Sequence, residues 1–203
     1  MTPTTPDTLR RPSRLDLAHG RLLLVGSGAF AVHQLPQWCV LLRRWYGIQV
    51  RVCLTHSASR LVASDAIAAA CGAPVEGPGW RTADGLVPHR QLAAWPDIVL
   101  VAPATAAFLA KLALGVGDSL ALSVVLDTTA PIVVAPSLPD GTSRRAAVQR
   151  HLRTLDEDGY RLVPTTAGRS LADGSETVGA LADLPTILRH VAVAAAQSGS
   201  EVR

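Results

Sequence analysis

Short runs of uninterrupted apolar residues recur along the chain, and segments with the apolar spacing of a helix follow them. The first run covers residues 22–25, the central run covers 98–101, and a later one covers 131–135. A strand that is apolar at every position is typical of a parallel sheet covered by helices on both faces. The pattern therefore predicts an α/β fold in which strands and helices alternate.

Capping and turn residues set the limits of the other expected elements. Pro36 can begin a helix that Gly47 ends, and Thr105 can cap a helix that stops before Gly115. A further helix opens near Thr55 and should continue without a break to residue 70. The expected strands are 22–25, 48–54, 98–102, 131–135 and 160–163, and the expected helices are 36–45, 55–70, 105–114, 118–128, 144–156 and 180–196.

One domain accounts for these elements. We expect it to cover residues 20–197 of the 203, between a mobile N-terminal tail (1–19) and a C-terminal tail (198–203). Segment 164–179 is polar, contains glycine and is too long for an ordinary connection. It is therefore either a functional loop or a disordered one.

Composition and charge exclude several classes of function. The net charge is only +3 and the arginines are scattered without interleaved aromatic residues, which disfavours nucleic acid as a partner. The three cysteines form no CxxC pair, so we expect neither a disulfide framework nor a metal site, and a reducing cytoplasm is the simpler location. No apolar run approaches the ~18 residues of a membrane-spanning helix.

Three strand ends carry small and hydroxyl-bearing residues and then lead into helices. They are Gly26-Ser27-Gly28, residues 55–60 and residues 103–106. The carboxyl edge of a parallel sheet is where α/β proteins bind ligands, and helix starts favour phosphate. Because GSG is not GxGxxG and no acidic residue follows the second strand, a mononucleotide is favoured over a dinucleotide. Tight turns without a ligand are the alternative.

Histidine is the natural general base near neutral pH. His89 follows a proline in what we expect to be a loop aimed at this edge, whereas His33 and His56 lie near the ligand loops and could touch a cofactor.

The central part of the chain resembles the homo-oligomeric flavin-containing cysteine decarboxylases. This family includes peptide decarboxylases of lantibiotic maturation and phosphopantothenoylcysteine decarboxylases. The likeness extends from about residue 21 to 196. It rests on Pro88-His89, on Pro103-Ala104-Thr105-Ala106, and on Lys111, Gly115 and Asp118 in the order of the family's next motif.

The resemblance implies a Rossmann-like, flavodoxin-type three-layer sandwich that binds FMN, with FAD as the alternative. The flavin would lie between subunits of a trimer, and such trimers often assemble into dodecamers. His89 would be the base while a cysteine is oxidised to a thioaldehyde and loses CO2. The implied cofactor contacts are Gly26, Ser27, Gly28, Thr55, Ser57 and Arg60, with Pro103, Ala104 and Thr105 against the ring.

Several positions depart from the family pattern. Ala107 and Ser119 stand where the family has asparagines, and Pro136-Ser137-Leu138-Pro139 replaces its substrate motif P-x-M-N-x-x-M-W. These changes favour a precursor-peptide C-terminus over phosphopantothenoylcysteine as the substrate, with an inactive scaffold subunit as the further alternative. Segment 164–179 lies where the family has its substrate clamp, so the expected substrate contacts are Ala107, Ser137, Arg169 and Ser170.

Overall fold

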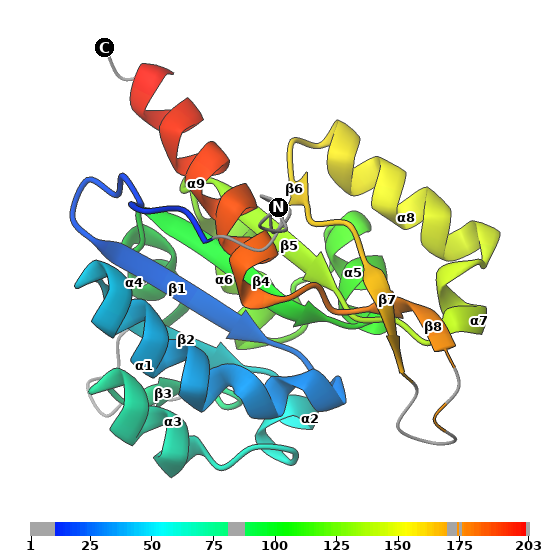
Figure 1. Cartoon of the computed structure of the whole chain (residues 1–203), viewed down its shortest axis with the longest axis horizontal. Coiled ribbons are helices and arrows are strands. Elements are labelled where there is room, and N and C mark those ends of the chain that lie inside the picture. Colours follow the sequence, from blue (N-terminus) through cyan, green and yellow to red (C-terminus); the bar gives the residue numbers. More distant parts are fainter. Residues whose placement is uncertain (1–10, 81–87, 170–173, 175, 202–203) are drawn as a thin grey trace, which may run out of the picture.

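Six parallel strands form the central sheet, in the order β3-β2-β1-β4-β5-β6 (Figure 1). The structure is a computed structural model that describes residues 11–80, 88–169, 174 and 176–201. The order is that of a Rossmann-like sheet, so the predicted fold class is confirmed. The strands are β1 (Arg21–Gly26), β2 (Gln49–Leu54), β3 (Val75–Glu76), β4 (Ile98–Ala104), β5 (Ile132–Pro136) and β6 (Arg161–Leu162).

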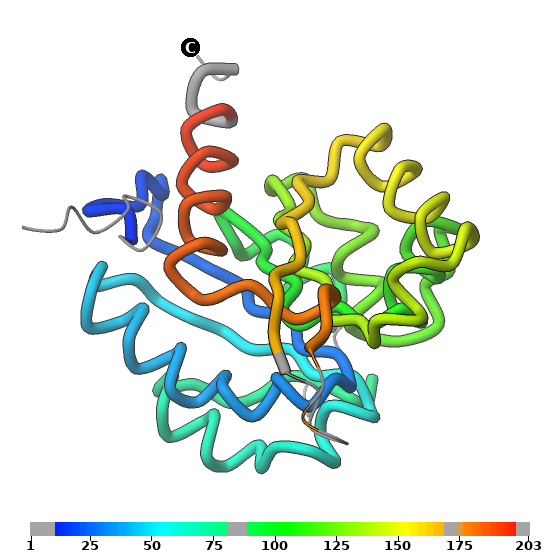
Figure 2. Tube along the Cα trace, turned by 45° about the vertical axis from the view of Figure 1, so that its right-hand side comes forward, coloured from blue at the N-terminus to red at the C-terminus, as the bar shows by residue number. Residues whose placement is uncertain are grey.

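Alternate residues of the strands pack into two separate cores, one on each face of the sheet. Leu22 and Leu24 face helices α1 (Leu35–Tyr46), α3 (Ser64–Cys71) and α9 (Leu184–Glu201). Leu23 and Val25 face α4 (Pro88–Ala94), α5 (Ala106–Ala113), α6 (Leu120–Asp127) and α8 (Ala146–Glu157). This arrangement is the expected three-layer sandwich, and Figure 2 shows the far end of α9 projecting beyond it.

Caps that the sequence predicts end the helices. Gly47 and Gly72 adopt the left-handed conformation, with φ of 65° and 70°, at the ends of α1 and α3. The hydroxyl of Thr105 accepts a hydrogen bond from the Phe108 N–H and so caps α5. Ser119 caps α6 in the same way, since its hydroxyl accepts from the Leu122 N–H.

One expected helix is divided in two, and one expected loop contains strands. The helix expected over 55–70 is divided into α2 (His56–Ser59) and α3. At the end of α2 the Ser59 hydroxyl donates to the His56 carbonyl, a bond of the kind that competes with helical bonding. In segment 164–179, β7 (Thr166–Arg169) pairs antiparallel with β8 (Glu176–Ala180). This hairpin delays the start of the last helix, α9, to residue 184.

Smaller differences concern short elements and one strand end. β4 continues through Pro103 to Ala104, with an irregular register after Val101. The proline removes one N–H donor without ending the strand. The described residues also form three short helices that the patterns do not predict, η2 (Phe30–Gln34), α4 and α7 (Asp140–Ser143).

The described part of the expected N-terminal tail packs against the domain. Leu15 is only 9% exposed, and the Arg11 guanidinium lies over the Trp45 ring at 4.7 Å. The Tyr46 hydroxyl donates to the Pro12 carbonyl at 2.8 Å. Residues 11–19 are therefore ordered by α1 and the core beneath it. At the other end, α9 continues to residue 201, into the expected C-terminal tail.

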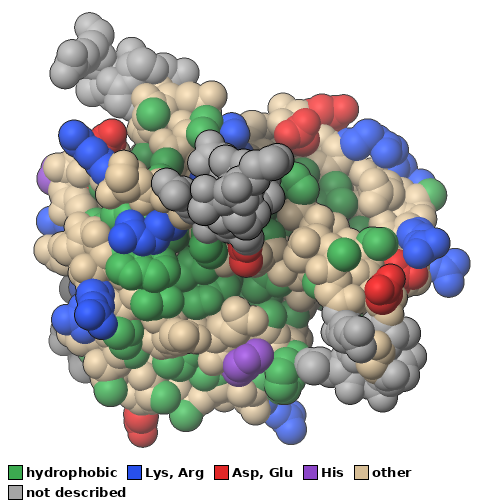
Figure 3. Space-filling model, in the orientation of Figure 1, with side chains coloured by type: hydrophobic (Ala, Val, Ile, Leu, Met, Phe, Trp, Pro, Cys, Tyr) green, Lys and Arg blue, Asp and Glu red, His purple; other side chains and the backbone are tan. Residues whose placement is uncertain are grey.

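Surface chemistry is mixed. On the face drawn in Figure 3, basic side chains lie apart near the margins of the molecule, with apolar surface between them. Within the described ranges no helix is long and apolar enough to span a membrane. The same ranges contain no cluster of three or more potential metal ligands. All three cysteines are buried and free.

Candidate active site

A buried serine joins the ends of the two central strands. Ser27, 1% exposed, follows β1, and its N–H donates to the Pro103 carbonyl of β4 at 3.1 Å. Its hydroxyl donates to the same carbonyl at 2.7 Å and accepts from the Thr105 N–H at 2.8 Å. The residue expected to touch a cofactor thus fixes the loop after β1 beside the first turn of α5.

The loop after β2 approaches this junction closely. A Cβ atom on Gly28 would overlap the Cβ and Oγ of Ser57, so only glycine fits there. The Thr55 N–H donates to the Gly26 carbonyl at 3.0 Å, and the hydroxyls of Thr55 and Ser57 lie 3.3 Å apart. We call the assembled set, Gly26, Ser27, Gly28, Thr55, Ser57 and residues 103–105, the cradle.

The cradle adjoins the first turn of α5. N–H groups in a first helical turn have no partner within the helix, and the helix dipole makes this end partly positive. Ala106 and Ala107 supply these groups, and both residues line a groove of about 950 Å³. The cradle and this helix start therefore suit a cofactor with hydrogen-bond acceptors and negative charge.

The groove takes its walls from four separate segments. Gly28, Thr105, Ala107 and Ser137 are the expected site residues among those lining it. The other lining residues are Ala29, Phe30, Ala31, His33, Gln34, Ala106, Leu138, Pro139, Asp140, Thr142, Glu176, Thr177, Ala180 and Leu181.

Some residues of the groove are missed by sequence reasoning. Phe30 is 57% exposed there, and its ring lies 4.7 Å from that of His33, one of the two histidines thought able to touch a cofactor. Glu176 and Thr177 reach the groove from the hairpin. A backbone hydrogen bond joins the hairpin to the segment after β5: the Leu138 N–H donates to the Gly179 carbonyl at 2.8 Å. In the sequence, the unusual length of segment 164–179 is the one signal that points to a functional role for the residues of the hairpin.

His89 does not lie in a loop aimed at the cradle, as we expected. It occupies the first turn of α4 and is not among the residues lining the groove. Its ring meets that of Trp80 edge-on, with centroids 5.7 Å apart. Its Nδ1 is buried without a hydrogen-bond partner among the described residues. The general base expected from the sequence is therefore separate from the groove within one chain.

The remaining expected residues have mixed positions. Pro103 and Ala104 are buried in β4, so they can present only backbone to a ligand. Arg60 is exposed at the end of α2. Arg169 is the last residue of β7, and Ser170 lies outside the described residues.

Comparisons with known proteins agree on one family. The model of the family described as "Flavoprotein" matches residues 10–195. The coenzyme A biosynthesis bifunctional protein CoaBC of Vibrio cholerae is 35% identical over 155 residues, which is 75% of this chain and 38% of CoaBC. The chain thus spans well under half the length of that relative.

Two solved structures match nearly their whole length. The FMN-dependent cysteine decarboxylase SpaF is 30% identical, with a TM-score of 0.76 over 88% of this chain and 97% of SpaF. TvaF, an FMN-dependent cysteine decarboxylase from thioviridamide biosynthesis, is 26% identical, with a TM-score of 0.72 over 89% of this chain and 99% of TvaF.

Proposed function

The chain belongs to the Flavoprotein family, and we propose that it is an FMN-dependent decarboxylase acting on the C-terminal cysteine of a precursor peptide. Its relatives SpaF and TvaF are described as FMN-dependent cysteine decarboxylases. The observation that carries the proposal is the cradle, where Ser27 joins two strand ends beside a helix start. The family and these relatives agree with FMN as the cofactor.

The residues of the cradle fit the phosphate and ribityl chain of FMN. Within the cradle, Thr55 and Ser57 offer hydroxyl groups. Outside it, Arg60 at the end of α2 offers a cation that forms no ion pair with another described residue. The missing side chain of Gly28 lets Ser57 lie directly against the loop after β1, which keeps the two hydroxyl groups close to that loop. First-turn N–H groups of Ala106 and Ala107, which line the groove, would donate to the flavin.

When bound, FMN supplies a two-electron oxidant for the cysteine side chain, after which the oxidised residue can release CO2. The chain's own contribution is to hold the peptide and to move protons. His89 would accept a proton from the substrate, because an imidazole nitrogen can act as a general base. Trp80, packed edge-on against it, restricts the orientation of the imidazole ring.

His89 reaches the groove from a neighbouring subunit in this proposal. The residue does not line the groove of its own chain, and the family resemblance implies a flavin between subunits of a trimer. A symmetric homo-oligomer repeats the same contact, so each site would combine one chain's cradle with the next chain's histidine.

The peptide would enter along the hairpin side of the groove. Glu176 and Thr177 form that wall, Phe30 offers apolar surface, and Ser137 offers a hydroxyl. Ala107 leaves room where the family has an asparagine. A reducing cytoplasm suits both a thiol substrate and the three free cysteines of the chain.

The first experiment compares His89→Asn with the unchanged protein. We expect the variant to keep its flavin, visible as a yellow protein, and to lose turnover of a cysteine-terminated peptide. Turnover is measured by mass spectrometry, because oxidative decarboxylation lowers the mass of the peptide by about 46 Da, the mass of CO2 and two hydrogens. A fully active variant would refute the role of the histidine.

Mixing two inactive variants tests the shared site. When His89→Asn and Gly28→Val chains are unfolded and reassembled together, about a quarter of the sites should contain one intact cradle and one intact histidine. Recovery of activity in the mixture, with none in either variant alone, is the expected result. No recovery in well-assembled mixtures would show that both groups act within one chain.

Phosphopantothenoylcysteine is the second candidate substrate, and the identity of 35% to CoaBC is what favours it. The replaced asparagine at Ala107 and the changed motif at 136–139 argue against it. An assay with both substrates decides between them. A yellow protein that decarboxylates neither would instead support a scaffold subunit.

A further inference from the structure

The groove beside the cradle contains one histidine among the described residues that line it, His33. His33 lies in η2, the short helix after β1, and its side chain is exposed, so a ligand in the groove can reach it. His89 does not line this groove. Within the described part of one chain, His33 is therefore the imidazole that a bound substrate can meet.

A hydrogen bond fixes which ring nitrogen of His33 carries the hydrogen. Nδ1 lies 2.7 Å from the Phe30 carbonyl oxygen, and because a carbonyl oxygen can only accept, Nδ1 is the donor. In the neutral imidazole the other nitrogen, Nε2, then has a lone pair and no hydrogen. The Phe30 ring lies against the imidazole, with centroids 4.7 Å apart, and limits its rotation. His33 therefore offers a proton acceptor whose identity and orientation are set by its own helix.

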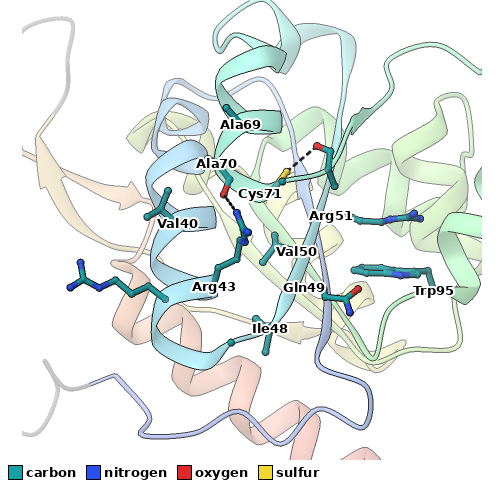
Figure 4. A pocket seen from close by; sticks show the side chains of 14 residues that line it. Val40, Arg43, Ile48, Gln49, Val50, Arg51, Ala69, Ala70, Cys71 and Trp95 are labelled. Atoms are coloured by element: carbon teal, nitrogen blue, oxygen red, sulfur yellow. Dashed lines mark hydrogen bonds between the residues drawn. The ribbon is translucent and has the colours of Figure 1, made fainter.

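The other charged groups of the two large hollows are less suited to accept a proton. In the groove, Asp140 is already in an ion pair at 2.8 Å, and Glu176 offers a carboxylate, in general a weaker base than an imidazole. The charged residues that line the second hollow, of about 860 Å³ at the start of β2, are arginines, which stay protonated (Figure 4). Arg43 of α1 and Arg51 of β2 also lie on opposite faces of the sheet, so they do not converge on one ligand. The groove histidine is therefore the best-placed base in either hollow.

A base in the groove has a defined task if the substrate ends in cysteine. A free cysteine thiol ionises with a pKa of about 8.5, so at neutral pH most of it is protonated, whereas the thiolate is the reactive form. We propose that Nε2 of His33 accepts the S–H proton of the substrate cysteine. This inference rests on the proposed function and adds a second proton-transfer residue to the same site.

The balance of protons and electrons gives the two histidines different tasks. The S–H bond breaks, its electron pair stays on sulfur, and the proton moves to Nε2 of His33. His89 of the neighbouring subunit takes one proton from the carbon that bears the sulfur, and two electrons leave the substrate for FMN. Loss of CO2 then leaves an enethiolate, to which His33 returns its proton. Counted from the neutral carboxylic acid, the substrate has lost CO2 and two hydrogens, as the proposed reaction requires.

His33→Asn separates the roles of the two ring nitrogens. The asparagine amide can still donate to the Phe30 carbonyl in place of Nδ1, but it has no counterpart of Nε2. We expect the flavin content to stay unchanged and kcat for a cysteine-terminated peptide at neutral pH to fall about a hundredfold. The deficit should shrink above about pH 9, where the thiol ionises unaided. The matched control, His151→Asn on α8, changes a histidine that does not line the groove and should alter kcat less than about twofold.

Ultraviolet difference absorbance gives a readout that does not depend on turnover. In protein whose flavin has been chemically reduced, the peptide binds without being oxidised, and a thiolate absorbs more strongly in the ultraviolet than a thiol. The reference is the same peptide ending in serine. We expect a thiolate signal at neutral pH in the unchanged protein and in His151→Asn, but not in His33→Asn.

The results distinguish this inference from the proposed function. An unimpaired His33→Asn, or a deficit that is equal at neutral and alkaline pH with the thiolate signal intact, would overturn the role of His33 alone. If the unchanged protein turns over no cysteine-terminated peptide, the proposed function fails and this inference fails with it. If His33→Asn loses its flavin, His33→Gln takes its place, since its amide reaches toward the position of Nε2 but cannot act as a base.

Discussion

Replacing Ser27 with alanine removes the hydroxyl that joins the ends of β1 and β4. The Pro103 carbonyl would keep a partner, because the Ser27 backbone N–H also donates to it at 3.1 Å. The Thr105 N–H would lose the acceptor that lies 2.8 Å away. An unsatisfied buried donor costs about 1–3 kcal/mol, and since Thr105 is only half-buried we expect about 1–2 kcal/mol. For a chain of this size the melting temperature should fall by roughly 2–8 °C.

Urea unfolding of the flavin-free protein measures this loss directly, and the slope of the transition should stay unchanged. Ser59→Ala is the matched control, because its hydroxyl also donates to a carbonyl, that of His56, but near the surface. We expect the control to cost less than about 0.5 kcal/mol. Equal effects of the two substitutions would refute the reasoning that the Ser27 hydroxyl has a special role. FMN affinity should also fall in Ser27→Ala, since Thr105 and the start of α5 lose their anchor.

Other substitutions test separate parts of the structure. Gly28→Ala forces a methyl group into Ser57, so the purified protein should contain much less flavin by absorbance at the visible band. Leu155→Ala removes the one side chain that α8 buries fully and should cost about 2–5 kcal/mol in urea unfolding. Burial opposes ionisation of Asp97, but hydrogen bonds from the Arg21 N–H and from His19 outweigh it and lower its pKa. Its stabilising effect is therefore present above about pH 4 and is lost as the pH falls further, and Asp97→Asn should flatten that acid limb. Burial and the nearby Arg161 and Arg189 lower the pKa of His190, so stability should fall as the pH drops below about 6.5, and less so in His190→Gln.

Local chemistry accounts for the parts of the fold that sequence patterns predict. Thr105 caps α5 and Gly47 ends α1 because a cap bonds to atoms only a few residues away. Strands such as β4 are apolar at every position because helices cover both of their faces. The cradle could also be anticipated, since the carboxyl ends of parallel strands meet at one edge.

Long-range contacts account for the parts that could not be predicted. The hairpin of β7 and β8 depends on a hydrogen bond to Leu138, which precedes it by many residues. Leu15 lies in a segment whose composition is typical of a mobile tail, yet its side chain is buried in the core cluster that includes α1. The proline before His89 favours a loop in the sequence, although proline is also common in the first turn of a helix, where the structure has it.

The contact between Gly179 and Leu138 limits how the groove could be redesigned. A Cβ atom on Gly179 would overlap the Leu138 carbonyl oxygen, so the hairpin and the segment after β5 are fitted to each other at backbone level. A hairpin grafted from a relative with another substrate would need glycine at this position and the donor's own 136–139 segment. The two segments are far apart in the chain, yet a redesign would have to replace both of them together.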